Sequence, residues 1–190
     1  MYATSTESVL PYIDRWFQQD NPRCAYDFCI GTGRFASVVR AATKASVAGC
    51  TTRAGIDRSL YVAVDNCTPI TAAGTLSAQR CDLWVLDHVL DLMPLPQAYN
   101  VMRLAGCAPR TVFVRTCVGL WFDTIEVAGL QQDVRPILPQ EILSWPLELS
   151  HVRIFSIQGL EPRIYHELAP CLALSEPGSF VADLLFHSCC

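Results

Sequence analysis

The segment Asp27-Phe28-Cys29-Ile30-Gly31-Thr32-Gly33-Arg34 carries the strongest structural signal in this sequence of 190 residues. It joins a short apolar run, Cys24–Ile30, to a stretch from Arg34 to about Val47 whose apolar residues recur at helical spacing. A strand, a glycine turn and a helix in this order open an α/β unit. Glycines in such a turn let a ligand approach the backbone, and the start of the helix favours an anionic group. The segment therefore predicts a ligand site at the end of the first strand.

The rest of the chain continues the alternation of strands and helices. A helix is predicted over residues 4–19, in which Pro11 must either lie in the first turn or break the helix, and another over roughly Pro96–Leu104, ending at Gly106. Further strands are predicted at Leu60–Val64, Ile70–Ala73, Leu83–Leu86, Thr111–Cys117, Val152–Ile157 and Phe180–Phe186. This order predicts a single α/β domain over residues 1–190, with a mostly parallel central sheet and helices on both faces. We divide it into an N-terminal helical segment (1–22), a core (24–117) and C-terminal strands that complete the sheet (118–190).

The composition excludes several classes of protein. Apolar residues make up 51% of the chain and charged residues 17%, which excludes intrinsic disorder. A net charge of −4 argues against a strongly basic nucleic-acid coat or a polybasic membrane module. No apolar run reaches the roughly 18 residues that span a bilayer, and residues 1–19 lack the pattern of a secretory signal. We expect a soluble, cytoplasmic protein without a membrane partner.

The ten cysteines do not form a recognisable motif. There is no C-x-x-C pair, and most cysteines lie in or beside apolar runs, where free cysteine behaves as a small hydrophobic residue. This pattern predicts free thiols in a reducing compartment. The only candidate zinc ligands are His187, Cys189 and Cys190, and we expect no metal.

The opening segment resembles the first motif of class I S-adenosylmethionine-dependent methyltransferases, an acidic residue followed by a Gly-x-Gly-x-Gly turn. Asp27, Gly31 and Gly33 match the acid and the last two glycines, whereas Cys29 replaces the first glycine. The resemblance implies a Rossmann-like fold in which these four residues bind S-adenosylmethionine. It covers about residues 24–117 and makes this range the cofactor-binding core.

The resemblance also implies contacts to the ribose and the adenine of the cofactor. In the family, an acid after the second strand binds the ribose hydroxyls. Asp65 follows the strand-like run Leu60–Val64, and Asp57 lies nearer the usual spacing but follows a poorer strand, so both are candidates. Where the family often has Gly-Asp near the adenine, this chain has Gly74-Thr75-Leu76, which leaves the backbone or Thr75 for the adenine contact.

The run from Cys81 to Leu90 resembles the fourth strand of the family and the loop that follows it. The resemblance implies that Asp87 lines both the cofactor and the acceptor side, with His88 beside it as the residue that can act as a base near neutral pH. Lys44 is the only lysine, which excludes the Lys-Asp-Lys-Glu tetrad of ribose 2′-hydroxyl methylation. Arg115 lies near the place of the second lysine, where it could stabilise charge but not act as a base.

Two other subclasses lack their motifs. The loop after Asp87 contains neither the Asp/Asn-Pro-Pro-aromatic motif of exocyclic amino methylation nor a Pro-Cys nucleophile. What remains is an acceptor that needs little activation, and the first expectation is RNA, such as a cap guanine N7. A small molecule or a protein side chain stays open.

Two alternative interpretations use the same residues. Gly31-x-Gly33-x-x-Ala36 also fits the nicotinamide-binding pattern, but that pattern gives Asp27 no role. The second alternative is a methyltransferase-like subunit that has lost catalysis and serves as a scaffold or protein partner in a larger assembly. Cys29 in place of glycine and the missing acid at Thr75 motivate it.

Overall fold

The computed structural model describes residues 10–28, 34–51, 66–69, 81–107, 110–118, 124–127, 130–133, 135, 137–156, 164–165 and 180–188. The helices are α1 (Leu10–Asp20), α2 (Arg34–Thr43), α4 (Leu95–Ala105) and α5 (Pro139–Ser144), with a 3-10 turn η3 at Leu90–Leu92. The strands are β1 (Cys24–Asp27), β2 (Ser46–Thr51), β3 (Asn66–Pro69), β4 (Leu83–Asp87), β5 (Thr111–Val118), β6 (Thr124–Val127), β7 (Leu130–Asp133), β8 (Glu148–Ser156), β9 (Ile164–Tyr165) and β10 (Phe180–His187).

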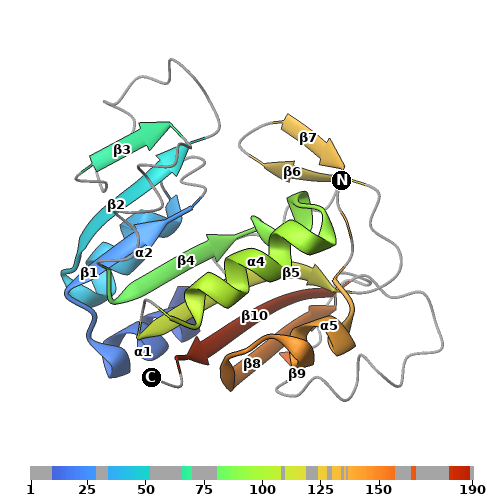
Figure 1. Cartoon of the computed structure of the whole chain (residues 1–190). Coiled ribbons are helices and arrows are strands. Elements are labelled where there is room, and N and C mark those ends of the chain that lie inside the picture. The colour runs from blue at the N-terminus through green and yellow to red at the C-terminus, as the bar shows by residue number, and fades with distance from the viewer. Residues whose placement is uncertain are drawn as a thin grey trace.

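One eight-stranded sheet forms the centre of the described structure, in the order β3-β2-β1-β4-β5-β10-β8-β9 (Figure 1). The strands from β3 to β5 pair in parallel, and the pairs from β5 to β9 are antiparallel. Because β10 is antiparallel to both β5 and β8, those two strands run in the same direction. The predicted α/β fold is confirmed, and the antiparallel pairs are confined to the C-terminal part of the chain. The pattern did not predict α5 or the separate β6–β7 hairpin.

The strand order reverses between β1 and β4. From β1 the chain passes through α2 to β2 on one side, and from β4 it passes through α4 to β5 on the other side. In open α/β sheets, ligands bind outside the carboxyl ends of the strands at such a reversal. Asp27 and Asp87 are the last residues of β1 and β4, so the topology places both beside the expected ligand site.

Two apolar layers cover the sheet, as predicted. Helix α4 lies in front of the strands in Figure 1, and its buried residues Ala98, Met102 and Ala105 belong to one layer together with Ile142 of α5. Helices α1 and α2 supply the other layer through Trp16, Phe17, Ala36 and Val39, which pack with Val85 and Phe113. All eight residues of β5 are buried, which explains the nearly continuous apolar run at this central strand.

The helix predicted to reach about Val47 is wrong at its end, because α2 stops at Thr43. The hydroxyl of Thr43 donates to the carbonyl of Val39 at 2.7 Å and accepts the amide N–H of Ala45 at 3.0 Å. Lys44 then adopts a φ of 58°, in the left-handed region that ends helices. The spacing of apolar residues does not contain these hydrogen bonds, and small residues such as Ala45 fit a helix or a strand.

Residues after Lys44 form the second strand of the sheet, β2, which pairs with β1 from Cys24↔Ser46 onward. The predicted second strand, Leu60–Val64, lies outside the described residues, and this prediction is corrected because β2 occupies the second place in the sheet. Asp57 and Asp65 also lie outside the described residues; Asp65 directly precedes β3 rather than following the second strand. The choice between the two acids as the ribose ligand therefore stays a prediction.

The attachment of α1 to the sheet depends on Phe17, which is fully buried and meets the ring of Phe113 edge-on at a centroid distance of 5.6 Å. We expect Phe17→Ala to lower the free energy of unfolding by about 3–5 kcal/mol because it leaves a cavity between the helix and β5. Urea denaturation followed by tryptophan fluorescence measures this. Gln18→Ala, at the exposed neighbouring position, is the control and should change stability by no more than about 0.5 kcal/mol. Equal effects of the two substitutions would contradict the assigned packing.

Candidate active site

Two carboxylates flank the reversal point of the sheet. Asp27 is 1% exposed, and its position in β1 aligns with Val85 of β4. The amide of Phe28 donates to the carbonyl of Val85 at 3.0 Å and continues this pairing beyond the end of β1. At the end of β4, Oδ1 of Asp87 is buried and has no hydrogen-bond partner among the described residues. A buried carboxylate oxygen without a donor is unfavourable, so a ligand with donor groups or positive charge fits here.

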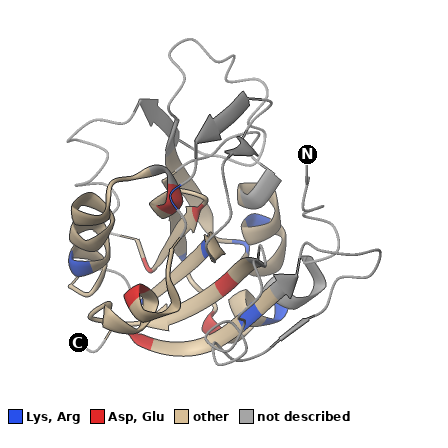
Figure 2. Cartoon of the chain, turned by 90° about the vertical axis from the view of Figure 1, so that its right-hand side faces the viewer, with Lys and Arg blue, Asp and Glu red and all other residues tan. Residues whose placement is uncertain are grey.

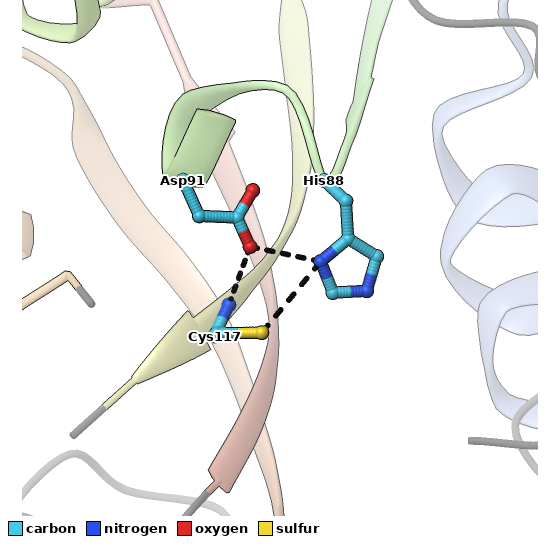
Figure 3. A group of neighbouring side chains, drawn as sticks. All are labelled: His88, Asp91 and Cys117. Atoms are coloured by element: carbon cyan, nitrogen blue, oxygen red, sulfur yellow. Dashed lines mark hydrogen bonds and ion pairs between the residues drawn. The ribbon is translucent and has the colours of Figure 1, made fainter. Parts of the chain in front are cut away.

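His88 follows Asp87 and turns the chain at the end of β4. Its φ of 51° is uncommon for a residue with a side chain, and such backbone strain gathers at functional sites. Its amide donates to the carbonyl of Arg115 at 2.8 Å, and its ring Nδ1 lies 2.8 Å from Oδ2 of Asp91 (Figure 3). The turn therefore folds the histidine ring back onto a carboxylate three residues later.

Asp91 is completely buried and is held from several sides. Its Oδ2 also accepts the amide N–H of Cys117 at 3.0 Å, and its carbonyl accepts the amide N–H of Arg135 at 2.7 Å. The guanidinium of Arg135 donates to the carbonyl of Met93 at 2.9 Å and pairs with Glu141 at 2.7 Å. These contacts fix the 3-10 turn η3, and with it the orientation of the carboxylate that faces His88.

The surroundings of His88 suit a base. Burial by itself lowers the pKa of His88, but the charge of Asp91, its hydrogen bond to the ring and the charge of Asp87 raise it, and the net pKa lies above the ordinary 6.5. In the neutral ring, Nδ1 donates its proton to Asp91, which leaves Nε2 as the basic nitrogen. Figure 3 shows Nε2 on the side of the ring that faces away from Asp91 and Cys117. A histidine oriented in this way by a carboxylate can remove a proton from a neighbouring group.

His88, Asp91 and Cys117 also bring three ligand-type atoms within 4.8 Å of one another. In the structure these three residues form a hydrogen-bonded group. Burial raises the pKa of the Cys117 thiol strongly, and the charges of Asp91 and Asp87 raise it further, so the sulfur is protonated when no cation is bound. Oδ2 of Asp91 already accepts hydrogen bonds from two groups. The expectation that His187, Cys189 and Cys190 hold no zinc is not tested, because Cys189 and Cys190 lie outside the described residues.

A row of alternating charges crosses the sheet next to this group. Asp87 of β4 aligns with Arg115 of β5, which aligns with Asp183 of β10, which aligns with Arg153 of β8. We call these four residues the charge row; Figure 2 shows such charged segments within the strands. Arg115 and Asp183, 3% and 0% exposed, form two hydrogen bonds of 2.7 and 3.0 Å. The guanidinium of Arg153 lies 5.1 Å from the ring centre of Trp16, so the helix layer covers this end of the row.

The structure thus brings three predicted site residues, Asp27, Asp87 and His88, to the carboxyl edge of β1 and β4. The other predicted cofactor residues lie outside the described residues: Cys29, Gly31, Gly33, Asp57, Asp65, Thr75 and Leu76. Sequence reasoning missed Asp91 and Asp183. For Asp183, the available signal is a single charged residue in the middle of the apolar run FVADLLF. Trp84 is buried in the core, as expected, and Trp121 lies outside the described residues.

No family model and no curated protein sequence matches the chain. Solved structures do resemble it. The magnesium protoporphyrin IX methyltransferase of Synechocystis PCC 6803 with bound SAM has a TM-score of 0.55 at 13% identity, over 94% of this chain and 79% of that chain. The methyltransferase domain of a bacterial Hen1 has a TM-score of 0.56 at 11% identity, over 96% and 98% of the two chains. An O-methyltransferase family protein from Burkholderia thailandensis has a TM-score of 0.57 at 10% identity, over 96% of this chain and 56% of that one.

At such low identity the likeness establishes the fold. It extends over 94% and 96% of this chain for the first two structures, and so is not limited to the parallel core. Each helix in the described part of the chain is too short or too polar to cross a membrane.

The raised pKa of His88 makes the stability of the fold depend on pH. A raised pKa in the folded state contributes stability that is complete below the unfolded value of about 6.5 and is lost as the pH rises through the folded value. Replacement by Asn removes this contribution and keeps a residue that tolerates positive φ. We therefore expect the stability advantage of the wild type over His88→Asn to shrink as the pH increases, measured by urea denaturation.

Asp91→Asn provides the control for this effect. It preserves the shape of the buried side chain and removes the charge that raises the pKa of His88. In the Asp91→Asn background, the stability change caused by His88→Asn should depend less on pH. A pH dependence of the same size in both backgrounds would show that Asp91 does not set it.

Proposed function

We propose that this chain, which has the class I methyltransferase fold, is an S-adenosylmethionine-dependent methyltransferase in which His88 removes a proton from the acceptor. The observation that carries the proposal is the His88–Asp91 pair directly after the last residue of β4, beside the reversal point of the sheet. The three comparison structures are methyltransferases by their descriptions, and one of them contains SAM.

The described residues fit a cofactor with a positive charge and hydroxyl groups. Asp27 and Asp87 place two carboxylates at the carboxyl edge, and Oδ1 of Asp87 is buried without a donor among the described residues. S-adenosylmethionine, when bound, supplies an activated methyl group on a positively charged sulfur. The remaining proposed cofactor residues, which the family resemblance assigns, are Cys29, Gly31, Gly33, Asp57 or Asp65, Thr75 and Leu76.

In the proposed reaction, His88 accepts the proton that the acceptor loses, at Nε2, while Nδ1 keeps its proton and donates it to Asp91. The carboxylate of Asp91 stabilises the positive charge that then develops on the ring. Asp91 does not need to move, because the amide of Cys117 holds its carboxylate and the amide of Arg135 holds its backbone carbonyl. Methyl transfer itself depends largely on holding donor and acceptor in line, so no further catalytic side chain is required.

This arrangement favours an acceptor with an O–H group. The acceptor first expected from the sequence, a guanine N7, carries no proton that must be removed, so it would not need the His88–Asp91 pair as a base. A hydroxyl becomes a good nucleophile only when it loses its proton, and an oriented histidine supplies that step. We therefore propose hydroxyl-bearing acceptors as the substrate class, with RNA retained as one of the acceptor pools in the test.

The first experiment measures binding of S-adenosylmethionine and S-adenosylhomocysteine by calorimetry. We expect both to bind the wild type, and Asp27→Asn to weaken binding by at least about tenfold, or about 1.4 kcal/mol. The matched control is Asp82→Asn, because Asp82 directly precedes β4 at the opposite, amino edge of the sheet. It should leave the affinity unchanged. Absence of binding at high micromolar concentrations would remove the enzyme proposal and favour the scaffold alternative.

The second experiment measures transfer of a radiolabelled methyl group to pools of small hydroxyl compounds, RNA and protein. We expect His88→Asn to reduce transfer about 100- to 10,000-fold, the usual contribution of a general base, while cofactor affinity is retained. Transfer to RNA that is insensitive to His88→Asn would contradict the role of the histidine and favour N7 methylation. Cofactor binding without transfer to any pool would favour a subunit that has lost catalysis.

A further inference from the structure

We propose that Arg115 is a positioning residue for the candidate base: clamped by Asp183, it brings a fixed positive charge to the group formed by Asp87, His88 and Asp91. The proposal rests on the proposed function, because it assigns Arg115 to the same reaction. It concerns the two middle members of the charge row, Arg115 and Asp183, which form an ion pair across neighbouring strands.

Arg115 contacts the candidate base through its backbone, and its side chain lies on the same face of the sheet as Asp87. Its carbonyl accepts the amide N–H of His88 at 2.8 Å, which fixes the strained residue at the end of β4. Its position in β5 aligns with Asp87, so the two side chains lie on the same face of neighbouring strands. A substitution at Arg115 therefore alters the side-chain charge without removing the backbone contact to His88.

Asp183 holds the guanidinium in one orientation. Nε and Nη2 of Arg115 reach the two carboxylate oxygens at 2.7 and 3.0 Å, and both residues are almost fully buried. Such a two-point contact restricts the planar guanidinium more than a single ion pair does. Arg153 aligns with Asp183 from the other side, so each inner member of the charge row has neighbours of opposite sign. The positive charge beside Asp87 is therefore fixed by the sheet and not by a mobile loop.

The position of this charge matters because the other charged groups that act on His88 in the described part of the chain are acidic. Asp91 and Asp87 favour the protonated ring, and the Cys117 sulfur lies 3.9 Å from Nδ1 as a neutral thiol, whereas the charge of Arg115 opposes protonation. Without Arg115, His88 would retain its proton to higher pH and would be less available as a base at neutral pH. Its positive charge thus offsets part of the effect of two carboxylates that are needed for orientation and ligand binding.

The test is a titration of the His88 ring by nuclear magnetic resonance in the full chain labelled at histidine, with the signal assigned through His88→Asn. We expect Arg115→Met, which keeps an unbranched side chain and removes the charge, to move the titration to higher pH. Arg153→Met is the matched control, because Arg153 is equally buried, lies on the same face and is two strands further from His88. It should move the titration less, although both substitutions break the charge row.

A second variant, Asp183→Asn, should shift the titration of His88 in the opposite direction. It also tests the proposal if Arg115→Met does not fold. It keeps the shape of the side chain and leaves the charge of Arg115 with less compensation, so the titration of His88 should move to lower pH. Movement to higher pH, or none, would overturn the proposal. Equal movement in Arg115→Met and Arg153→Met would also overturn it, because that result indicates a general loss of packing.

The experiment separates this inference from the proposed function, since the titration needs neither S-adenosylmethionine nor an acceptor. If the chain binds no cofactor but the His88 titration shifts as expected in the variants, the methyltransferase proposal is refuted and the electrostatic role of Arg115 is supported. A chain that transfers methyl groups but shows no shift refutes only the role of Arg115. If the enzyme is active, the rise of its methyl-transfer rate with pH should shift to higher pH in Arg115→Met, together with the titration of His88. In Arg115→Lys, which keeps the positive charge, this rise should stay near that of the wild type.

Discussion

The ion pair between Arg115 and Asp183 is the contact on which the C-terminal half of the sheet depends. Strand β10 enters between β5 and β8 and pairs with both along its length. Side chains alternate between the two faces of a strand, so a slip of one residue would move Asp183 into the apolar layer beneath α4. A buried carboxylate without a partner is strongly unfavourable there, whereas in the observed register it forms an ion pair with the guanidinium of Arg115. The pair therefore specifies the register of the last strand in the chain.

The same register connects the core with the candidate site. Arg115 reaches toward the interior through its side chain and toward His88 through its carbonyl. The positive φ of His88 is unfavourable by itself, and such strain persists where surrounding contacts determine the conformation. Asp91 supplies one of these contacts through the histidine ring, and Arg135 fixes the turn from outside. The same set of polar contacts therefore contributes to the stability of the sheet and to the orientation of the candidate base.

Local patterns predicted much of this fold for identifiable reasons. The strands β1, β4, β5 and β10 and helix α4 lie where apolar runs, helical spacing and the glycine at 106 predicted them. The second strand was missed because Ala45 and Val47 continue the apolar face of α2, while the hydrogen bonds of Thr43 end that helix. Asp87 and His88 were predicted because the run from Cys81 to Leu90 resembles the fourth strand and following loop of the family, and they do lie at the end of β4. Asp91 was not found, since its role depends on a turn that brings it back to the ring.

The sequence by itself determined the class of fold, the edge of the sheet at which a ligand is predicted to bind and the resemblance that points to S-adenosylmethionine. These follow from local information: the order of strands and helices, the residues at strand ends and the glycine turn after Asp27. Only the tertiary structure decided which charges act together. Arg115 and Asp183 are 68 residues apart and become partners because β10 pairs beside β5, and Cys117 reaches Asp91 because β5 follows β4 in the sheet. Pairing between distant strands selects such partners, and no spacing along the chain records that choice.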